Sequence, residues 1–220
     1  MKIKWLFIFL LLPPLLPAQE DAVPPAFTAG DIQLREAGFV NMAYPPFPKF
    51  YFDMRYAGTE NFTGKKIYNF RSCWLRKEAA EAVVKAYDLL QKRRPGLTFL
   101  FYDCYRPESD QQTLWDAYPD PRYIAPPEKG SRHSRGMAAD ITLAGADGAP
   151  LEMPTGFDSF SPLAHMNYNG KKISASAKQN RELLKQIMLD AGFTYTRTEW
   201  WHFDKIGWAE YPIEDIQPED

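Results

Sequence analysis

Two short segments, about sixty residues apart, hold the side chains with the clearest chemical potential. Residues 131–140 read Ser-Arg-His-Ser-Arg-Gly-Met-Ala-Ala-Asp, and residues 199–202 read Glu-Trp-Trp-His; they contain two of the three histidines in the chain. A hydrolytic zinc site needs three protein ligands, an open position for water, and a nearby carboxylate that is not a ligand. The residues that fit these roles are His133, Asp140 and His202 as ligands and Glu199 as the free carboxylate.

Each of these residues has a simpler reading when it is taken alone. His133 could be a loop histidine, Asp140 a helix cap, His202 a core histidine and Glu199 a surface residue of a strand. Taken together, a mixed set of imidazole and carboxylate donors suits zinc. A glutamate so close in sequence to a ligand could act as general base and then protonate the leaving amine. The pattern therefore predicts a zinc hydrolase.

Further motifs extend this pattern and resemble the D-alanyl-D-alanine dipeptidases. These enzymes are the VanX-like branch of the zinc D,D-peptidases, which share a fold with the Hedgehog signalling domain. The resemblance covers roughly residues 50–205, with the motifs in the family's order. The segments that carry it are 56–64, 102–107 (Tyr-Asp-Cys-Tyr-Arg-Pro), 131–136, 139–143, 153–158 and 199–203.

The resemblance implies an activity and further site residues. The implied reaction is the hydrolysis of D-Ala-D-Ala to two D-alanines with one zinc ion per chain. Arg106 would bind the oxyanion that develops on the attacked carbonyl. Asp158 would hold the ammonium group of the substrate, and Ser131 would contact the substrate backbone. The alternatives are a surface salt bridge for Arg106 and an Asx turn for Asp158.

Two other functions stay open at this stage. A D,D-carboxypeptidase or endopeptidase acting on muropeptides could use the same metal site, but it needs a channel at the substrate's amino end. A non-catalytic wall-binding module could keep the fold, although it has no need for a general base such as Glu199. A small dipeptide is therefore the expected partner, and the sequence identifies no protein partner.

The apolar pattern predicts one α+β domain of the Hedgehog/D,D-peptidase type, with a small, mainly antiparallel sheet and packed helices. A loop-rich insertion is expected over 144–172, between a strand and the second long helix. The expected helices cover 75–92, 111–118 and 175–191, and the expected strands cover 97–102, 137–143 and 193–203.

The N-terminal part of the chain reads as a targeting signal followed by an arm. Residues 1–18 combine a basic start with a short apolar run, which is typical of a secretory signal peptide; an uncleaved anchor is the alternative. We expect a Pro-rich extended arm over 19–49 and the dipeptidase domain over 50–220. An exported, periplasmic enzyme without stable membrane insertion would meet dipeptide from cell-wall turnover, which favours scavenging over antibiotic resistance.

Charge and cysteine content agree with this assignment. The formal net charge is -2 over 220 residues, with no large basic cluster, so nothing points to nucleic acid or an anionic membrane surface. Cys73 and Cys104 form an even pair in a chain predicted to reach an oxidising space. Cys104 also stands where many cytoplasmic relatives have glycine, which suggests a disulfide with Cys73. Two buried free thiols are the alternative.

Overall fold

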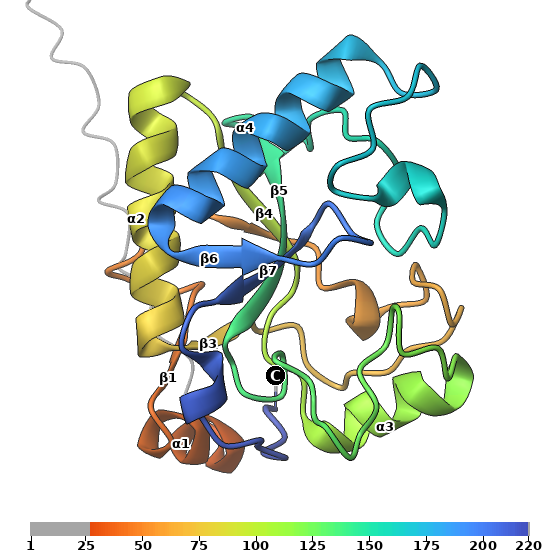
Figure 1. Ribbon diagram of the computed structural model, residues 1–220. Helices are drawn as coiled ribbons and strands as arrows, with labels where there is room; N and C mark the ends of the chain where they lie inside the picture. The colour runs from red at the N-terminus through yellow and green to blue at the C-terminus, as the bar shows by residue number, and fades with distance from the viewer. Residues whose placement is uncertain (1–26, 220) are drawn as a thin grey trace, which may run out of the picture.

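The computed structural model describes residues 27–219 and shows helices packed on a mixed sheet (Figure 1). The predicted signal peptide, residues 1–18, lies outside the described residues. The helices are α1 (Ala29–Glu36), α2 (Lys77–Arg93), α3 (Glu108–Ala117) and α4 (Ala175–Ala191), with short 3-10 turns η1 (Arg55–Ala57), η2 (Pro162–Ala164) and η3 (Trp208–Glu210). The strands are β1 (Phe39–Asn41), β2 (Tyr51–Phe52), β3 (Trp74–Arg76), β4 (Thr98–Asp103), β5 (Ala138–Ala144), β6 (Phe193–Tyr195) and β7 (His202–Lys205).

The main sheet has five strands in the order β2-β4-β5-β7-β6. The pairing of β2 with β4 is parallel and the other three pairings are antiparallel. Every residue of β4 and β5 is buried, because these central strands are covered on both faces. Such strands read as continuous apolar runs and not as alternating ones. The α+β fold class predicted from the sequence is confirmed.

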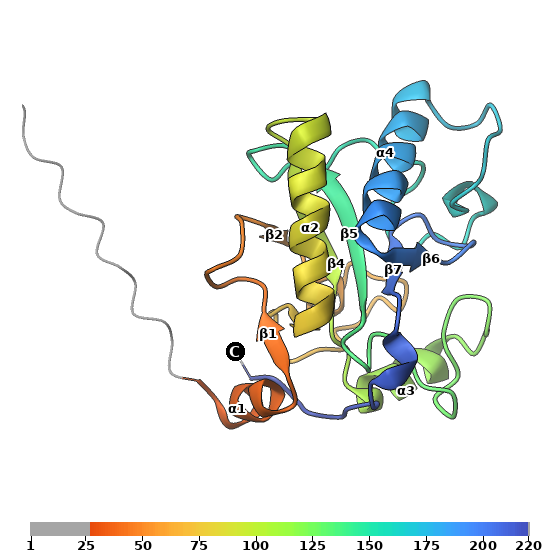
Figure 2. The same ribbon diagram turned by 60° about the vertical axis from the view of Figure 1, so that its left-hand side comes forward.

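Helices α2 and α4 lie side by side and cover one face of the sheet (Figure 2). The buried face of α2 repeats every three or four residues, at Ala79, Val83, Ala86 and Leu90, as an amphipathic helix requires. Ser174 caps the start of α4, and Gly192 ends it with a left-handed φ of 98°. Helix α4 matches the expected segment, and α2 spans 77–93 where 75–92 was expected.

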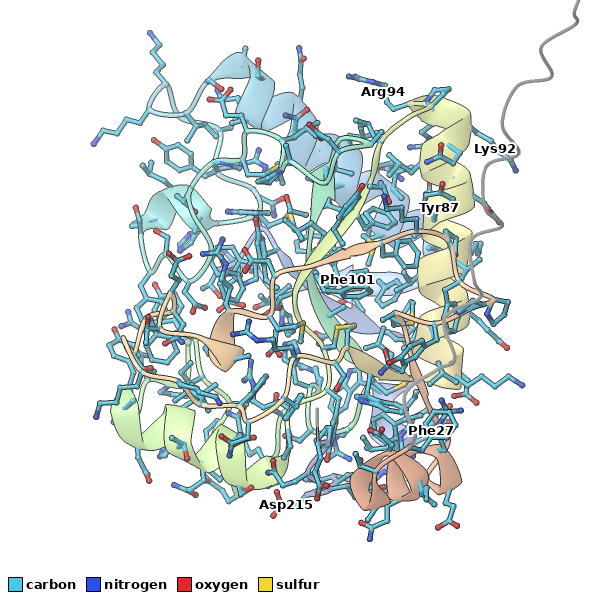
Figure 3. All side chains as sticks on the ribbon, turned by 180° about the vertical axis from the view of Figure 1, so that it is seen from behind. Phe27, Tyr87, Lys92, Arg94, Phe101 and Asp215 are labelled. Carbon is cyan, nitrogen blue, oxygen red and sulfur yellow. A yellow bond between two sulfur atoms is a disulfide. The ribbon has the colours of Figure 1, made fainter. Side chains whose placement is uncertain are left out.

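Aromatic side chains fill the space between α2 and the sheet. The ring of Phe50 lies 5.7 Å from Tyr87 of α2 and 5.5 Å from Phe101 of β4, between centroids. In Figure 3 the labelled Tyr87 and Phe101 lie in this layer between helix and strand. Burial of such rings supplies much of the hydrophobic stabilisation of a domain of this size.

Residues 27–49, the described part of the expected extended arm, contain regular secondary structure. They include α1, whose start is held by a capping box between Thr28 and Asp31, and then β1. Strand β1 pairs antiparallel with β3, with Val40 opposite Leu75. The helix was missed because its eight residues have a weak apolar pattern. The domain boundary at residue 50 stays a prediction.

The prediction of one final strand over 193–203 is wrong. These residues contain β6 and the start of β7, which pair antiparallel with Tyr195 opposite Phe203. Residues 196–201 connect the two strands, so Glu199 lies in a connection and not in a strand. The apolar pattern failed here because both the strands and their connection are rich in aromatic residues.

Cys73 and Cys104 form a disulfide, with their Cα atoms 5.3 Å apart. Cys73 directly precedes β3 and Cys104 directly follows β4, so the bond ties the entry of α2 to the segment that carries Arg106. Within residues 27–219, no helix has both the length and the apolar character that a membrane crossing requires.

Candidate active site

One cavity of about 140 Å³ opens where the ends of β4, β5 and β7 meet the irregular segments around α3 and η2. The cavity wall includes every side chain that the sequence analysis assigned to metal, catalysis or substrate. Those residues are Arg106, Ser131, His133, Asp140, Asp158, Glu199 and His202. Trp201 also forms part of the wall.

Three of these side chains bring atoms that could coordinate a metal close to one another. Asp140 Oδ1 lies 2.9 Å from His202 Nδ1 and 3.4 Å from His133 Nε2, and the two nitrogens are 3.1 Å apart. The register of the sheet places Asp140 of β5 directly opposite His202 of β7. His133 comes from the segment before β5. The sheet pairing therefore brings together residues that are far apart in the sequence.

The outward-facing nitrogens of the two histidines decide what the cluster can bind. His133 Nδ1 lies 2.6 Å from the carbonyl oxygen of Cys104, and His202 Nε2 lies 2.8 Å from Asp204 Oδ1. Both partners are acceptors, so each neutral ring places its N–H outward and its lone pair inward. Two lone pairs and the carboxylate of Asp140 then face one point. Such a donor set fits a cation, and the three residues form a candidate metal site.

Glu199 lines the same cavity without being part of this cluster. Burial, together with the negative charges of Asp140 and Asp158, raises the pKa of Glu199 to about 8, although His202 and Arg106 act in the opposite direction. A carboxyl group with a raised pKa can both accept and return a proton near neutral pH. The position of Glu199 is thus suited to acid–base chemistry.

Arg106 has a fixed orientation at the cavity wall. Its Nη2 donates to Asp103 Oδ2 at 2.5 Å, Nη1 donates to Gln111 Oε1 at 2.7 Å, and Nε donates to the Tyr68 hydroxyl at 3.1 Å. The guanidinium lies 5.1 Å from the centroid of the Tyr56 ring. Arg106 is only 6% exposed, so the surface salt bridge considered for it does not describe its environment.

Asp158 also lines the cavity, and its backbone has a positive φ of 59°, which is uncommon for a residue other than glycine. Its Oδ1 accepts from the Tyr56 hydroxyl at 3.0 Å and its Oδ2 from the Phe62 amide at 3.2 Å. These partners are remote in sequence, so the Asx turn considered for Asp158 is wrong. Burial and the charge of Asp140 raise the pKa of Asp158 to about 7.

Ser131 lines the cavity, but its side chain has a local role. Its hydroxyl accepts a hydrogen bond from the His133 amide at 3.2 Å, and the residue is buried. The C-terminal segment supports the same loop, because the Glu214 amide donates to the Ser134 carbonyl oxygen at 2.9 Å. The loop that carries His133 is thus held from both of its sides.

Several residues that hold the site together were not expected from the sequence. Asp103 is fully buried and accepts from Arg106, from the Tyr68 hydroxyl at 2.9 Å and from the Cys104 amide at 2.9 Å. Asp103 lies three residues before Arg106 in the same motif, which is a signal that could have identified it. The hydroxyls of Tyr56 and Tyr68 gave no such signal, because their partners come from distant segments.

Comparison with known proteins adds to this geometry. The family model Peptidase_M15, described as D-ala-D-ala dipeptidase, matches residues 35–217. A D-alanyl-D-alanine dipeptidase from Escherichia coli (strain K12) is 40% identical over 167 residues, which cover 76% of this chain and 84% of the relative. A D-alanyl-D-alanine dipeptidase from Enterococcus faecium is 34% identical over 175 residues, which cover 69% of this chain and 83% of the relative.

Solved structures show more distant likenesses. The LD-carboxypeptidase LdcB matches with a TM-score of 0.45 at 19% identity, over 79% of this chain and 70% of that one. The D,D-pentapeptidase VanY in complex with Zn(II) matches with a TM-score of 0.41 at 14% identity, over 64% of this chain and 78% of that one.

Proposed function

Because this chain belongs to the D-alanyl-D-alanine dipeptidase family and is a metallopeptidase that hydrolyses D-Ala-D-Ala, we propose that its metal is zinc and that Glu199 and Arg106 carry the reaction. The observation that supports this most strongly is the convergence of His133, Asp140 and His202 on one point of a cavity that Glu199 and Arg106 also line.

The donor set favours zinc among the common divalent ions. Two imidazole nitrogens and one carboxylate oxygen are typical of catalytic zinc sites that keep a position open for water. Calcium and magnesium prefer oxygen ligands throughout. When bound, zinc polarises the scissile carbonyl and lowers the pKa of a water molecule. His133, Asp140 and His202 would hold the ion.

Glu199 moves the proton in this proposal. Its carboxylate accepts a proton from the attacking water and then donates it to the amide nitrogen as the peptide bond breaks. One carboxyl group can serve both steps because it lines the same cavity as the three candidate ligands without belonging to their cluster. The ring of Trp201 is buried and lines this cavity, where its bulk limits the space for water.

Arg106 stabilises the charge that develops on the carbonyl oxygen. Its guanidinium is held in place by Asp103, Gln111 and Tyr68, so little reorganisation is needed as the charge appears. The ion pair with Asp103 also keeps the cation from being buried alone. Arg106 therefore acts as a pre-positioned donor and not as a mobile surface side chain.

Asp158 would bind the ammonium group of the free dipeptide. Each carboxylate oxygen has one hydrogen bond from the protein, and a carboxylate oxygen can accept two, so each keeps capacity toward the cavity. Placing a carboxylate there disfavours substrates whose amino group is blocked or extended. This supports a dipeptidase over a carboxypeptidase or endopeptidase on muropeptides. Ser131 would contact the substrate backbone, since its hydroxyl accepts from the His133 amide and keeps its own O–H as a donor.

We further propose an exported enzyme, with a signal peptide over 1–18, an N-terminal arm over 19–49 and the catalytic domain over 50–220. The disulfide supports this compartment, because disulfides persist in oxidising spaces such as the periplasm. An enzyme in that position would meet D-Ala-D-Ala released during wall turnover, so the proposed role is scavenging.

The test is zinc content and product analysis on purified protein. The parent should bind one zinc ion per chain and release D-alanine from D-Ala-D-Ala, while His202→Ala should lose both zinc and activity. A panel of mixed-chirality dipeptides and a muropeptide, analysed by mass spectrometry, separates the dipeptidase from the carboxypeptidase. Unchanged zinc affinity in His202→Ala would overturn the ligand assignment, and faster turnover of the muropeptide would overturn the substrate assignment.

A further inference from the structure

Asp204 is a buried carboxylate next to the candidate metal site that none of the steps above uses. It lies two residues after His202 in β7, and alternate residues of a strand point to the same face. Asp204 is 4% exposed, and its Oδ1 lies 2.8 Å from His202 Nε2. Backbone pairing on both sides, with Ala138 of β5 and Thr194 of β6, fixes its position.

The contact determines which nitrogen of His202 carries the proton. An ionised carboxylate only accepts hydrogen bonds, so Asp204 requires an N–H at Nε2. The neutral ring then has its lone pair at Nδ1, the atom 2.9 Å from Asp140 Oδ1. Without Asp204, either tautomer of His202 becomes available, and one of them presents an N–H to the metal position.

The two histidines of the cluster differ in this respect. His133 Nδ1 lies 2.6 Å from the backbone carbonyl oxygen of Cys104, and the carboxylate oxygen Asp103 Oδ2, which is paired with Arg106, lies further away at 3.6 Å. His202 Nε2 has a carboxylate oxygen, that of Asp204, at 2.8 Å. A carboxylate hydrogen-bonded to the far side of an imidazole increases the electron density at its ligating nitrogen. His202 should therefore be the more strongly donating histidine of the pair.

Arg132 forms an ion pair with Asp204 on the side away from His202. Its Nη1 lies 3.4 Å from Asp204 Oδ2, the oxygen that does not face His202. The guanidinium also lies 4.6 Å from the ring centroid of Trp208, in η3 just after β7. Arg132 lines the cavity, so a row of contacts runs from the cavity wall through Asp204 to a metal ligand.

We propose that Asp204, held by Arg132, is a positioning residue that fixes the tautomer of His202 and strengthens it as a metal ligand. The inference rests on the proposed metal site. The proposal names one residue that would raise the affinity of this site for its metal. Metal affinity can be measured without substrate, so the proposal can fail while the substrate assignment stands.

The experiment measures zinc affinity of the purified protein by competition with a chromophoric chelator. Loss of the carboxylate in Asp204→Ala should weaken zinc binding by about 10- to 100-fold. Asp204→Asn keeps an acceptor for Nε2–H but removes the charge, so its affinity should lie between those of the parent and Asp204→Ala. Arg132→Gln should weaken binding less than Asp204→Ala, because the carboxylate itself remains.

A spectroscopic readout separates ligand strength from general stability. Cobalt(II) in place of zinc should give a changed visible absorption spectrum in Asp204→Ala, because the donor strength of His202 changes. The matched control is Asp190→Asn, which breaks the ion pair of Asp190 with Arg93 at 2.6 Å away from the cavity. This control should keep both the zinc affinity and the cobalt spectrum of the parent.

Three results decide the matter. The affinity order parent, Asp204→Asn, Asp204→Ala supports the proposal, whereas an Asp204→Ala variant with the affinity and cobalt spectrum of the parent overturns it. If circular dichroism shows that Asp204→Ala does not fold, the near-isosteric Asp204→Asn and Arg132→Gln decide instead, and parental affinity in both overturns the proposal. A parent that binds no zinc overturns the metal site itself.

Discussion

Replacement of Glu199 by glutamine should abolish turnover and, at neutral pH, make the metal-free protein more stable. The two side chains have nearly the same shape, so the change mainly removes the ability to gain and lose a proton. A positioned general base contributes about 10²- to 10⁴-fold to rate, and kcat should fall by at least the lower figure. Burial raises the pKa of Glu199 from its ordinary 4.5 to about 8, and this shift sets the effect on stability.

The sign follows from proton binding in the two states. Between pH 4.5 and about 8 the folded protein retains a proton on Glu199 that the unfolded chain has released. The free energy of unfolding therefore falls as the pH rises through this window. At pH 7 the accumulated loss is about 3 kcal/mol, from about 1.4 kcal/mol per pH unit. Glutamine does not titrate, so Glu199→Gln should avoid this loss.

The assay is thermal unfolding of the chelator-treated parent and variant at pH 5 and pH 7. At pH 5 the difference in unfolding free energy should be below about 1 kcal/mol. At pH 7 the variant should melt about 6 to 12 °C above the parent, for a domain of this size. Glu81→Gln, at an exposed position of α2, is the control and should show no such gain.

A variant that is equally stable or less stable than the parent at pH 7 would refute the argument from burial. A variant that keeps the parental kcat would refute the role of Glu199 as general base. The two outcomes are independent, because the first is measured without metal and the second with it. Together they separate the electrostatic environment of Glu199 from its chemical role.

Three further predictions concern other parts of the site and fold. Arg106→Ala should lower kcat by about 10²- to 10³-fold, which steady-state kinetics would measure. The same change leaves Asp103 buried without its cation and should destabilise the protein by about 3 to 5 kcal/mol in urea unfolding. Arg106→Lys should recover part of the stability but little of the rate. Replacing both Cys73 and Cys104 by alanine should cost about 3 to 4 kcal/mol in the chain-entropy view for a separation of 31 residues, and thiol titration of the denatured, unreduced parent should find no free thiol. The parent should prefer free D-Ala-D-Ala over its N-acetylated form by about 10- to 100-fold in kcat/KM, and Asp158→Asn should lose most of that preference; equal rates in the parent would favour the carboxypeptidase.

The sequence alone determined the features that depend on local chemistry. Residue types and spacing identified the three candidate ligands and the free carboxylate, and apolar periodicity located α2 and α4 to within a few residues. These succeed because ligand chemistry and helix amphipathicity are both encoded within short segments. The order of motifs added the family, which the match over residues 35–217 then showed.

The tertiary structure alone decided how these parts meet. The register of β5 with β7 sets Asp140 opposite His202, and no property of either segment specifies that pairing. The contacts of Asp158 are also between distant segments, because its hydrogen-bond partners are Tyr56 and Phe62. An Asx turn is a local hydrogen bond, so considering only the neighbouring residues gave the wrong alternative. Glu199 was placed in a strand because aromatic residues continue through the connection between β6 and β7. Sheet register and long-range hydrogen bonds depend on contacts between distant segments, and those contacts exist only once the chain has folded.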